Sequence, residues 1–458
     1  MKAWFRIDLW KRVMIGLAIG LAIGTAVRYG MISSLGHDDG IARSQEIANI
    51  FKPLGDLFLN LIRMLVVPLI FLTLVSGVLA LGDPRKLGRL GGRTIGIYMM
   101  TTLVAVTLGL IMGTIFQPGN GYDLSSVTPE QIAETQARLE SGGALEQVGV
   151  YESIMRTILS IVPTNIVASM TNGDVLPIIF FAIMFGIGIL LAGEAGKPMA
   201  KVFDAGSEAI LKLTLIVMET APFGVAALMA WVMADQGFSV VSSLALMTVA
   251  LYLACALHML LTHGFLIKVV GRLPLIPFYR GITDAQLVAF STSSSSATLP
   301  VTLSVAEKNL GVGKSVASSV LPLGSTINMD GTALYQGLIA LFAAQALGID
   351  VSIGMYFTVA VMATLVSIGT AGIPSVSLFL ATTTLGVVGA TPEQMFVILA
   401  PLFAFDRLLD MMRTVTNITG DLAVSTLVAK WEGDLDEDIF RAEDNVTAEI
   451  DRTVTHDA

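Results

Sequence analysis

The side chains with the most evident chemistry lie on one apolar stretch near the C-terminal end, residues 395–429. Six polar or charged residues interrupt this stretch: Asp406, Asp410, Arg413, Thr414, Asn417 and Asp421. The steps from Asp406 to positions 410, 414, 417 and 421 are four, four, three and four residues, so these positions share one helix face. Charge inside a membrane is costly and usually faces a partner or a water-filled cavity. The pattern therefore indicates a binding site for a charged ligand.

The alternative is a buried ion-pair network that only fixes helix packing. Membrane helices usually pack through small residues instead, which favours the binding site. Arg407 lies nearer the start of the same stretch, and the sequence assigns it no role.

The composition indicates a membrane protein. The 458 residues are 54% hydrophobic and only 14% charged, and the mean hydropathy is +0.76, whereas a soluble chain carries about a quarter charged residues. Cys255 is the one cysteine, so no intramolecular disulfide forms, and we expect it to be a packing residue. The apolar stretches predict an all-α polytopic fold of eight spans. In chain order they cover residues 13–27, 54–81, 95–116, 154–192, 210–234, 240–270, 316–347 and 395–429.

Two further apolar segments, 282–310 and 353–388, are too broken to span. The first is interrupted by STSSSSATLP at 291–300 and the second by GTAGIPS at 369–375. Paired interruptions of this kind are typical of transporters built from inverted repeats, in which irregular backbone lines a cavity. We therefore expect two re-entrant helical hairpins whose tips meet near the middle of the bilayer.

The seventh span contains a similar interruption, NMDGT at 328–332. We expect Gly331 to loosen the helix and free carbonyl oxygens there, while Asn328 and Asp330 add oxygen ligands. Such ligands suit an alkali or alkaline-earth cation. No cluster of Cys and His has metal-ligand spacing, which argues against a transition metal. Glu219, His258 and His263 lie within spans, and we interpret them as packing or interfacial residues.

Four motifs in the same order resemble the glutamate transporter family, the dicarboxylate/amino acid:cation symporters. They are SSSSATLP, NMDGT, GTAGIP and DMMRTVTNITGD at 410–421, and RMLVVPLIF at 63–71 is also similar to the family. The resemblance covers the whole membrane portion. It implies a homotrimer that couples sodium ions, without an organic cofactor, to the uptake of L-aspartate or L-glutamate.

The resemblance also implies the site residues. Those for the substrate are Ser295, Thr332, Gly372, Asp410, Arg413, Thr414 and Asn417. In acidic-amino-acid carriers of the family, the arginine at the place of Arg413 holds the side-chain carboxylate, and the aspartate at the place of Asp410 holds the α-amino group. A planar guanidinium fork and an opposite charge suit these two groups.

Three cation sites carry over in the same way. One uses Asn328, Asn417, Asp421 and the carbonyl of Gly324. Another uses the carbonyls of Thr326, Ser367, Ile368 and Thr370. The third uses Tyr98, Thr101, Thr102, Asn328 and Asp330. Because the three sets are intact, the resemblance favours sodium over protons as the coupling ion.

One departure from the family concerns a second arginine, which acidic-amino-acid members carry in the first hairpin tip or two residues before the arginine of the last span. This chain has Ser293 and Met411 at those places. The charge balance of the empty site is therefore an open question.

The resemblance divides the chain into two kinds of domain. Residues 1–94 and 151–236 are expected to form a scaffold, and span 3 within 95–150 together with residues 237–430 a moving transport domain. The loop 119–149 is acidic and expected outside, and residues 431–458 form an acidic, solvated cytoplasmic tail. Basic residues before the first span favour a cytoplasmic N-terminus, and we expect both termini on that side. The resemblance, to a prokaryotic member of the family, implies a bacterial inner membrane.

Other functions are less consistent with the residues. A proton-coupled glutamate carrier or a C4-dicarboxylate symporter is the nearest alternative, although Asp410 and Asp421 argue against a dicarboxylate. An ion channel could use a ring of carboxylates but has no need of Arg413. An intramembrane serine hydrolase would need a base beside the serine run, and the neighbouring motifs have neither His nor Lys. We therefore expect a transporter and not an enzyme.

Overall fold

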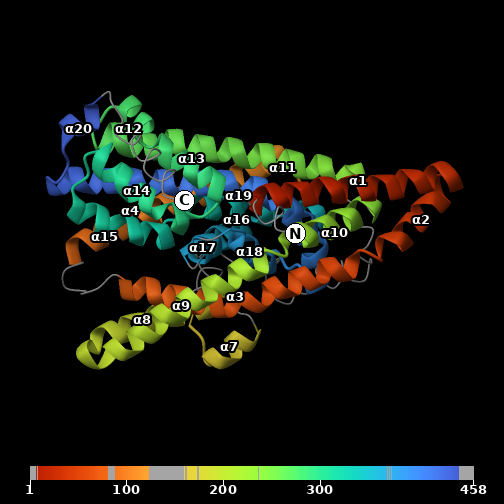
Figure 1. Ribbon diagram of the computed structural model, residues 1–458, viewed down its shortest axis with the longest axis horizontal. Coiled ribbons are helices and arrows are strands. Elements are labelled where there is room, and N and C mark those ends of the chain that lie inside the picture. The colour runs from red at the N-terminus through yellow and green to blue at the C-terminus, as the bar shows by residue number, and fades with distance from the viewer. Residues whose placement is uncertain are drawn as a thin grey trace.

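The computed structural model is a bundle of helices (Figure 1). It describes residues 7, 9–80, 88–122, 159, 162–172, 175–235, 237–368, 370, 372 and 374–442. Over this part of the chain there is no β-strand, and one isolated antiparallel bridge joins Val312 to Leu435. The predicted all-α class is confirmed.

The N-terminal half provides a group of helices that pack on one another. Its members are α1 (Leu9–Leu35), α2 (His37–Ala48), α3 (Lys52–Ala80), α7 (Ile166–Asn172), α8 (Val175–Leu191), α9 (Lys197–Met218) and α10 (Ala221–Asp235). Helix α1 packs along α10 and α2, while α3 packs on α8, α9 and α10. Gly16, Gly20 and Gly24 form a stripe on α1, and a Cβ atom at any of them would collide with α10. Small residues thus let these two backbones approach closely, as membrane helices require.

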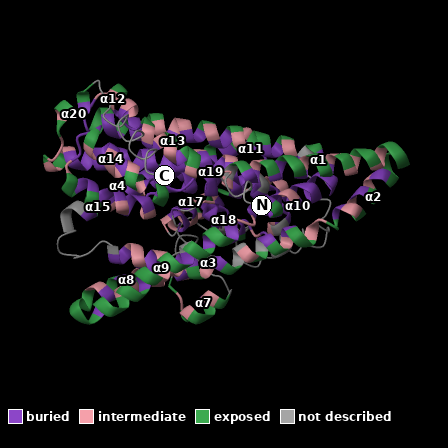
Figure 2. Ribbon diagram, viewed as in Figure 1, coloured by how far each residue is buried: buried purple, intermediate pink, exposed green. Residues whose placement is uncertain are grey.

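The remaining helices form a second group, which includes α4 (Gly88–Phe116) from the N-terminal half. The others are α11 (Phe238–Leu257), the π-helical segments η3 (His258–His263) and η4 (Leu266–Val270), α12 (Leu275–Gly281), α13 (Thr283–Thr292), α14 (Ser295–Lys308), α15 (Lys314–Ile327), α16 (Asp330–Ala346), α17 (Ile353–Ile368), α18 (Val376–Val387), α19 (Pro392–Glu432) and α20 (Glu437–Arg441). Helix α4 packs on α16, α11 and α17. Helices α16 and α19 lie inside the molecule and are largely buried (Figure 2).

Among the described residues, three stretches are long and apolar enough to cross a membrane: Lys11–Leu35, Gly91–Phe116 and Val240–Val270. The pair Gly193–Met218 and Ala221–Asp235 meets the same criterion together, with a bend of 50°. The predicted fifth span, 210–234, is therefore wrong in detail, because its helix begins earlier and bends at residues 219–220. Helix α2 lies between the predicted first and second spans. The count of eight spans stays a prediction.

Each predicted interruption coincides with a break between helices. Helices α13 and α14, here called the first helix pair, are separated by Ser293 in the left-handed conformation (φ 52°) and by Ser294, which caps α14. Helices α17 and α18, the second pair, are separated by the GTAGIP region, after which Ser375 is also left-handed (φ 64°). Gly369, Ala371 and Ile373 lie outside the described residues.

The break in the seventh span lies within the predicted interruption, at its first two residues. It falls at Asn328 and Met329, whose ψ angles are 78° and 55°. Gly331 is helical, so the expectation that it loosens the helix is wrong. Its missing side chain instead lets α16 approach the backbone of α19, because a Cβ atom there would collide with the Arg413 carbonyl.

Helix α19 is 41 residues long, or about 60 Å. It begins with a capping box, in which Gln394 N–H donates to Thr391 Oγ1 (3.4 Å) and Thr391 N–H donates to Gln394 Oε1 (2.8 Å). It ends at Gly433, whose φ of 73° suits a glycine. Capping residues at both ends therefore define where α19, the helix that carries the charged face, begins and ends.

The beginning of the acidic tail is folded, contrary to the expectation that the whole tail is solvated. Gly313 N–H donates to Asp434 O (2.8 Å), Asp436 N–H donates to Gly311 O (2.8 Å), and Phe440 of α20 is buried. These backbone bonds hold residues 434–436 against the turn between α14 and α15. The residues from 443 onward, like most of the loop 119–149 from residue 123, lie outside the described part of the chain.

Candidate functional site

The centre of the site is Arg413, which is fully buried on α19. One of its nitrogens, Nη2, donates to Asp406 Oδ1 (2.7 Å) and to Asp410 Oδ1 (2.8 Å). Its guanidinium lies 4.2 Å from the ring centre of Tyr335 on α16. Nε and Nη1 have no hydrogen-bond partner among the described residues. A buried guanidinium with two unpaired N–H donors costs free energy unless a ligand accepts hydrogen bonds from them. This arrangement therefore suits a carboxylate ligand.

The tips of the two helix pairs meet beside this arginine. The carbonyl oxygen of Gly372 accepts hydrogen bonds from Ser294 Oγ (2.6 Å) and from Ser296 N–H (3.0 Å). From the second pair, Ser375 N–H donates to Asp410 Oδ2 (2.8 Å). The structure thus brings the two tips into contact, as the sequence predicted, and links the second tip to the charged face of α19.

Arg407 contacts the tip of the first helix pair. Its Nη2 donates to the carbonyl oxygens of Ser291 (3.0 Å) and Thr292 (3.2 Å), the last residues of α13. A cation at the C-terminal end of a helix is favourable. The sequence left Arg407 unassigned, because nothing in its spacing indicates a carbonyl that comes from a segment more than one hundred residues earlier.

Other predicted substrate residues are present but bonded within the protein. Asn417 Oδ1 accepts from Gly331 N–H (2.7 Å), and Thr414 Oγ1 donates to the Asp410 carbonyl of its own helix (2.9 Å). Ser295 and Thr332 are buried at the starts of α14 and α16. The structure therefore gathers the predicted residues, and their roles as substrate ligands stay predictions.

The first predicted cation set lies at the break between α15 and α16. Asn328 Nδ2 donates to Asp421 Oδ1 (2.9 Å) and lies 3.5 Å from the Asn417 carbonyl oxygen. The Gly324 carbonyl accepts the N–H of Asn328 (2.8 Å). These oxygen-bearing groups from two helices converge, which is the arrangement that a hard cation requires.

The second predicted set borders a cavity of about 220 Å³ between α3 and the tips. Its lining includes Thr326, Ile368, Thr370 and Gly372, and hydroxyl-bearing residues of α3 and α9 face it from the other side. Ser367, the fourth member of the set, is buried in the last turn of α17.

The third predicted set surrounds Asp330. Its Oδ1 accepts from Thr102 Oγ1 (2.8 Å) and lies 3.4 Å from Thr101 Oγ1, which is also 3.4 Å from Asn328 Oδ1. Tyr98 is fully buried nearby, and its hydroxyl donates to the Val320 carbonyl (3.2 Å). Residues of α4 and α16 thus meet at this carboxylate.

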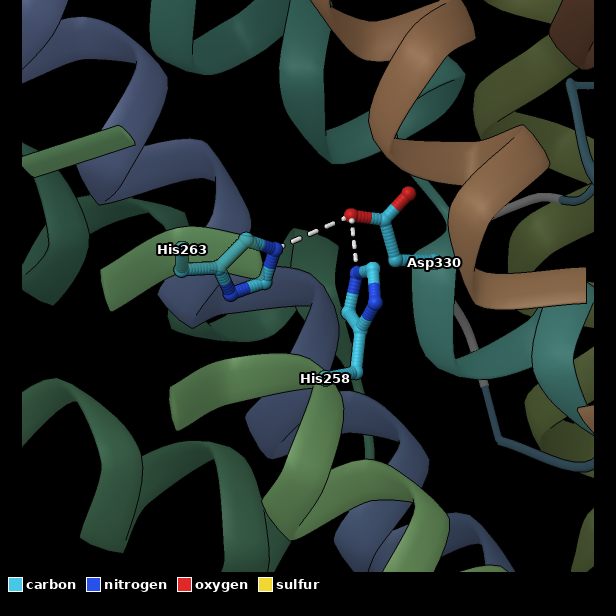
Figure 3. Close-up of side chains that lie close together, drawn as sticks. All are labelled: His258, His263 and Asp330. Atoms are coloured by element: carbon cyan, nitrogen blue, oxygen red, sulfur yellow. Dashed lines mark hydrogen bonds and ion pairs between the residues drawn. The ribbon is translucent and has the colours of Figure 1, made fainter. Parts of the chain in front are cut away.

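The other oxygen of Asp330 contacts two residues whose role the sequence misjudged. His258 Nε2 and His263 Nε2 each lie 3.1 Å from Asp330 Oδ2 (Figure 3). Their interpretation as packing or interfacial residues is wrong. Both belong to the π-helical segment η3, in which residues five apart share a face, whereas α-helical spacing puts them on different faces.

Glu219 has a structural partner that the sequence did not indicate. It forms a two-pronged ion pair with Arg12, Nη1 to Oε2 at 2.5 Å and Nη2 to Oε1 at 3.0 Å, and Arg12 is buried. The pair therefore joins α1 to the bend between α9 and α10. No local spacing could have predicted a partner so distant in the sequence. Cys255 is free and fully buried, as expected.

Helices broken at buried charged and polar residues, in a chain this apolar, define a multi-pass membrane carrier. The model of the sodium:dicarboxylate symporter family matches residues 9–431, and the chain belongs to this family. It is therefore a transporter and not an enzyme.

Three curated relatives cover most of the chain. A proton/sodium-glutamate symport protein of Geobacillus stearothermophilus is 35% identical, over 94% of this chain and 96% of the relative. A proton/glutamate-aspartate symporter of Escherichia coli (strain K12) is 37% identical, over 92% and 95%. A C4-dicarboxylate transport protein of Brucella anthropi is 33% identical, over 88% of each. Together they support a symporter of dicarboxylates or glutamate.

Proposed function

We propose that this protein couples sodium ions to the uptake of L-aspartate or L-glutamate. The observation that carries the proposal is Arg413, whose Nε and Nη1 are buried without a partner in the described residues. Beside it, Asp410 supplies a negative charge where an α-ammonium group can bind. A C4-dicarboxylate has no ammonium group, so Asp410 would repel one of its carboxylates.

The buried charges give the reason for cation coupling. Asp330, Asp406, Asp410 and Asp421 are buried, against the guanidinium groups of Arg407 and Arg413, so these six residues carry a formal charge of −2. An acidic amino acid adds one more negative charge. Net charge at membrane depth is costly, so cations must enter with the substrate. The three predicted oxygen-rich sets are the places where we propose that they bind.

The proposed mechanism is alternating access. A transport domain, span 3 with residues 237–430, moves against a scaffold of residues 1–94 and 151–236 in a homotrimer of the bacterial inner membrane, with both termini in the cytoplasm. The two helix groups that pack internally support this division. We propose that the two helix pairs are re-entrant hairpins and that the second, whose tip bonds Asp410, is the gate that closes over the substrate.

The test is uptake of radiolabelled aspartate into proteoliposomes, with gradients of sodium, protons and potassium imposed one at a time. We expect an inward sodium gradient alone to drive accumulation, and unlabelled glutamate, but not succinate, to compete. Accumulation driven by a proton gradient without sodium would identify the proton-coupled alternative. Uptake of succinate without aspartate uptake would identify a C4-dicarboxylate carrier.

Replacement of Asp421 by asparagine tests the cation role. The carboxylate accepts a hydrogen bond from Asn328, so asparagine preserves the shape and removes the charge. We expect the sodium concentration for half-maximal aspartate binding to rise at least tenfold, with saturating occupancy retained, because coupling between two ligands is reciprocal. Calorimetry at several sodium concentrations measures the shift. The control is Asp204→Asn, at a residue that accepts a hydrogen bond from Ser76 between α3 and α9. Equal aspartate affinity in sodium and in choline for the unmodified protein would contradict coupling.

A further inference from the structure

The cluster of His258, His263 and Asp330 contains two imidazole nitrogens, which sodium coupling does not need. The three side chains are fully buried, and their ligand atoms all lie within 4.8 Å of one another. Both Nε2 atoms point toward the same carboxylate oxygen (Figure 3). Sodium prefers oxygen ligands, whereas imidazole nitrogen is a ligand of zinc, copper, nickel and cobalt.

The distances are close to those of a metal centre. In a tetrahedral zinc site with bonds of about 2.0–2.2 Å, neighbouring ligand atoms lie about 3.3–3.5 Å apart. Here each Nε2 lies 3.1 Å from Asp330 Oδ2. The two Nε2 atoms lie within 4.8 Å of each other, so rotation of the imidazole rings that brings them closer would place the three atoms around one ion. The centroids of the two imidazole rings are 4.6 Å apart and the rings are nearly perpendicular, with an interplanar angle of 77°. The rings therefore do not stack on each other across this space.

Gly420 of α19 packs closely on the cluster. A Cβ atom at this residue would lie 3.0 Å from His263 Nε2, 3.2 Å from Asp330 Oδ2 and 2.6 Å from Asn328 Nδ2. A larger residue at Gly420 would therefore press on the cluster, and glycine at this position leaves the ligand atoms undisturbed. Three protein ligands and one water are the composition of an open zinc site.

The cluster is also held in place from outside. Thr102 and Thr101 contact the opposite oxygen of Asp330, and the π-helical turn of η3 keeps the histidines on one face. Neither Nδ1 atom has a hydrogen-bond partner in the described residues, so no second bond fixes the ring proton on Nε2. In the metal-free protein Nε2–H donates to the Asp330 carboxylate, and ligation of a metal by Nε2 requires the tautomer with the proton on Nδ1.

We propose that His258, His263 and Asp330 form a binding site for one divalent transition-metal cation, such as Zn²⁺, Co²⁺ or Ni²⁺, and that its occupation inhibits transport. The inhibition follows from Asp330, because a divalent cation bound at Oδ2 neutralises the carboxylate that we propose attracts a sodium ion to Tyr98, Thr101 and Thr102. This inference goes beyond the proposed function, and the binding part is independent of it.

The experiment is calorimetric titration of Zn²⁺ into the purified, tag-free full chain in sodium-free and substrate-free buffer. We expect one zinc ion per chain. His258→Ala and His263→Ala should each weaken the affinity at least tenfold, while His37→Ala, at an exposed residue of α2, should leave it unchanged. X-ray absorption spectroscopy at the zinc edge, on the unmodified protein, gives a measurement of the ligand shell that does not depend on the variants. We expect two imidazole nitrogens at bonds of about 2.0–2.1 Å.

The proposal has clear points of failure. It is overturned if the unmodified protein binds no zinc up to roughly millimolar concentration, if the histidine variants bind it as tightly as the unmodified protein, or if the ligand shell contains no imidazole. In proteoliposomes, zinc should block uptake by the unmodified protein and by His37→Ala. Full zinc occupancy with undiminished uptake would overturn the inhibitory role.

Discussion

Replacement of Arg413 by serine is expected to abolish the binding of acidic amino acids. The guanidinium is fully buried, and its Nε and Nη1 donors are the ones we assign to the substrate carboxylate. Loss of one partner of a buried ion pair costs on the order of 3–5 kcal/mol, or roughly a hundredfold to several thousandfold in affinity. Calorimetry with aspartate in saturating sodium measures this loss, and a small neutral amino acid is expected to gain binding.

Two controls separate recognition from damage to the fold. Arg93→Ser removes a partly exposed arginine that pairs with Glu432 at 2.9 Å, and aspartate affinity should not change. Asp406→Asn combined with Arg413→Ser removes one of the two carboxylates that the single variant leaves without a cation. If aspartate binding returns in this double variant, the fork of Arg413 is not what holds the substrate. Unchanged aspartate affinity in Arg413→Ser would refute the assignment directly.

Replacement of Gly372 by valine is expected to have the second largest effect on aspartate binding. A Cβ atom there would lie 2.7 Å from Ser296 Oγ, 2.9 Å from Ser296 N and 2.9 Å from Ser325 O, so the two tips could not meet. Loss of this closure should weaken aspartate binding by about one to two powers of ten, or about 1.4–3 kcal/mol. Transport should fall further than binding, because we propose that the second tip is the gate.

The matched control is Gly386→Val in the same helix pair. A Cβ atom at Gly386 would meet one side-chain atom, Met395 Cε at 3.9 Å, which is ordinary contact. Size-exclusion chromatography of both variants shows whether the fold and assembly are intact. If Gly372→Val and Gly386→Val bind and transport aspartate equally well, contact between the tips has no part in the mechanism.

Much of the architecture was determined by the sequence alone, because its signals are local. Helical spacing placed the polar residues of α19 on one face, and runs of serine, glycine and proline marked the breaks at 293–294 and 369–375. These features depend on neighbours within a few turns, and the cost of charge and of irregular backbone in a membrane makes them conspicuous. The meeting of Arg413 with Asp406 and Asp410 followed from the same spacing.

The tertiary structure decided the contacts between distant segments. The pair of Arg12 and Glu219 joins residues 207 positions apart, and Arg407 holds a tip formed 115 and 116 positions earlier. A π-helical turn placed His258 and His263 together on Asp330, where an α-helix would have separated them. Periodicity carries no information about a partner on another helix or about a local change of pitch. Those depend on which faces pack, and packing is settled only when the whole chain is folded.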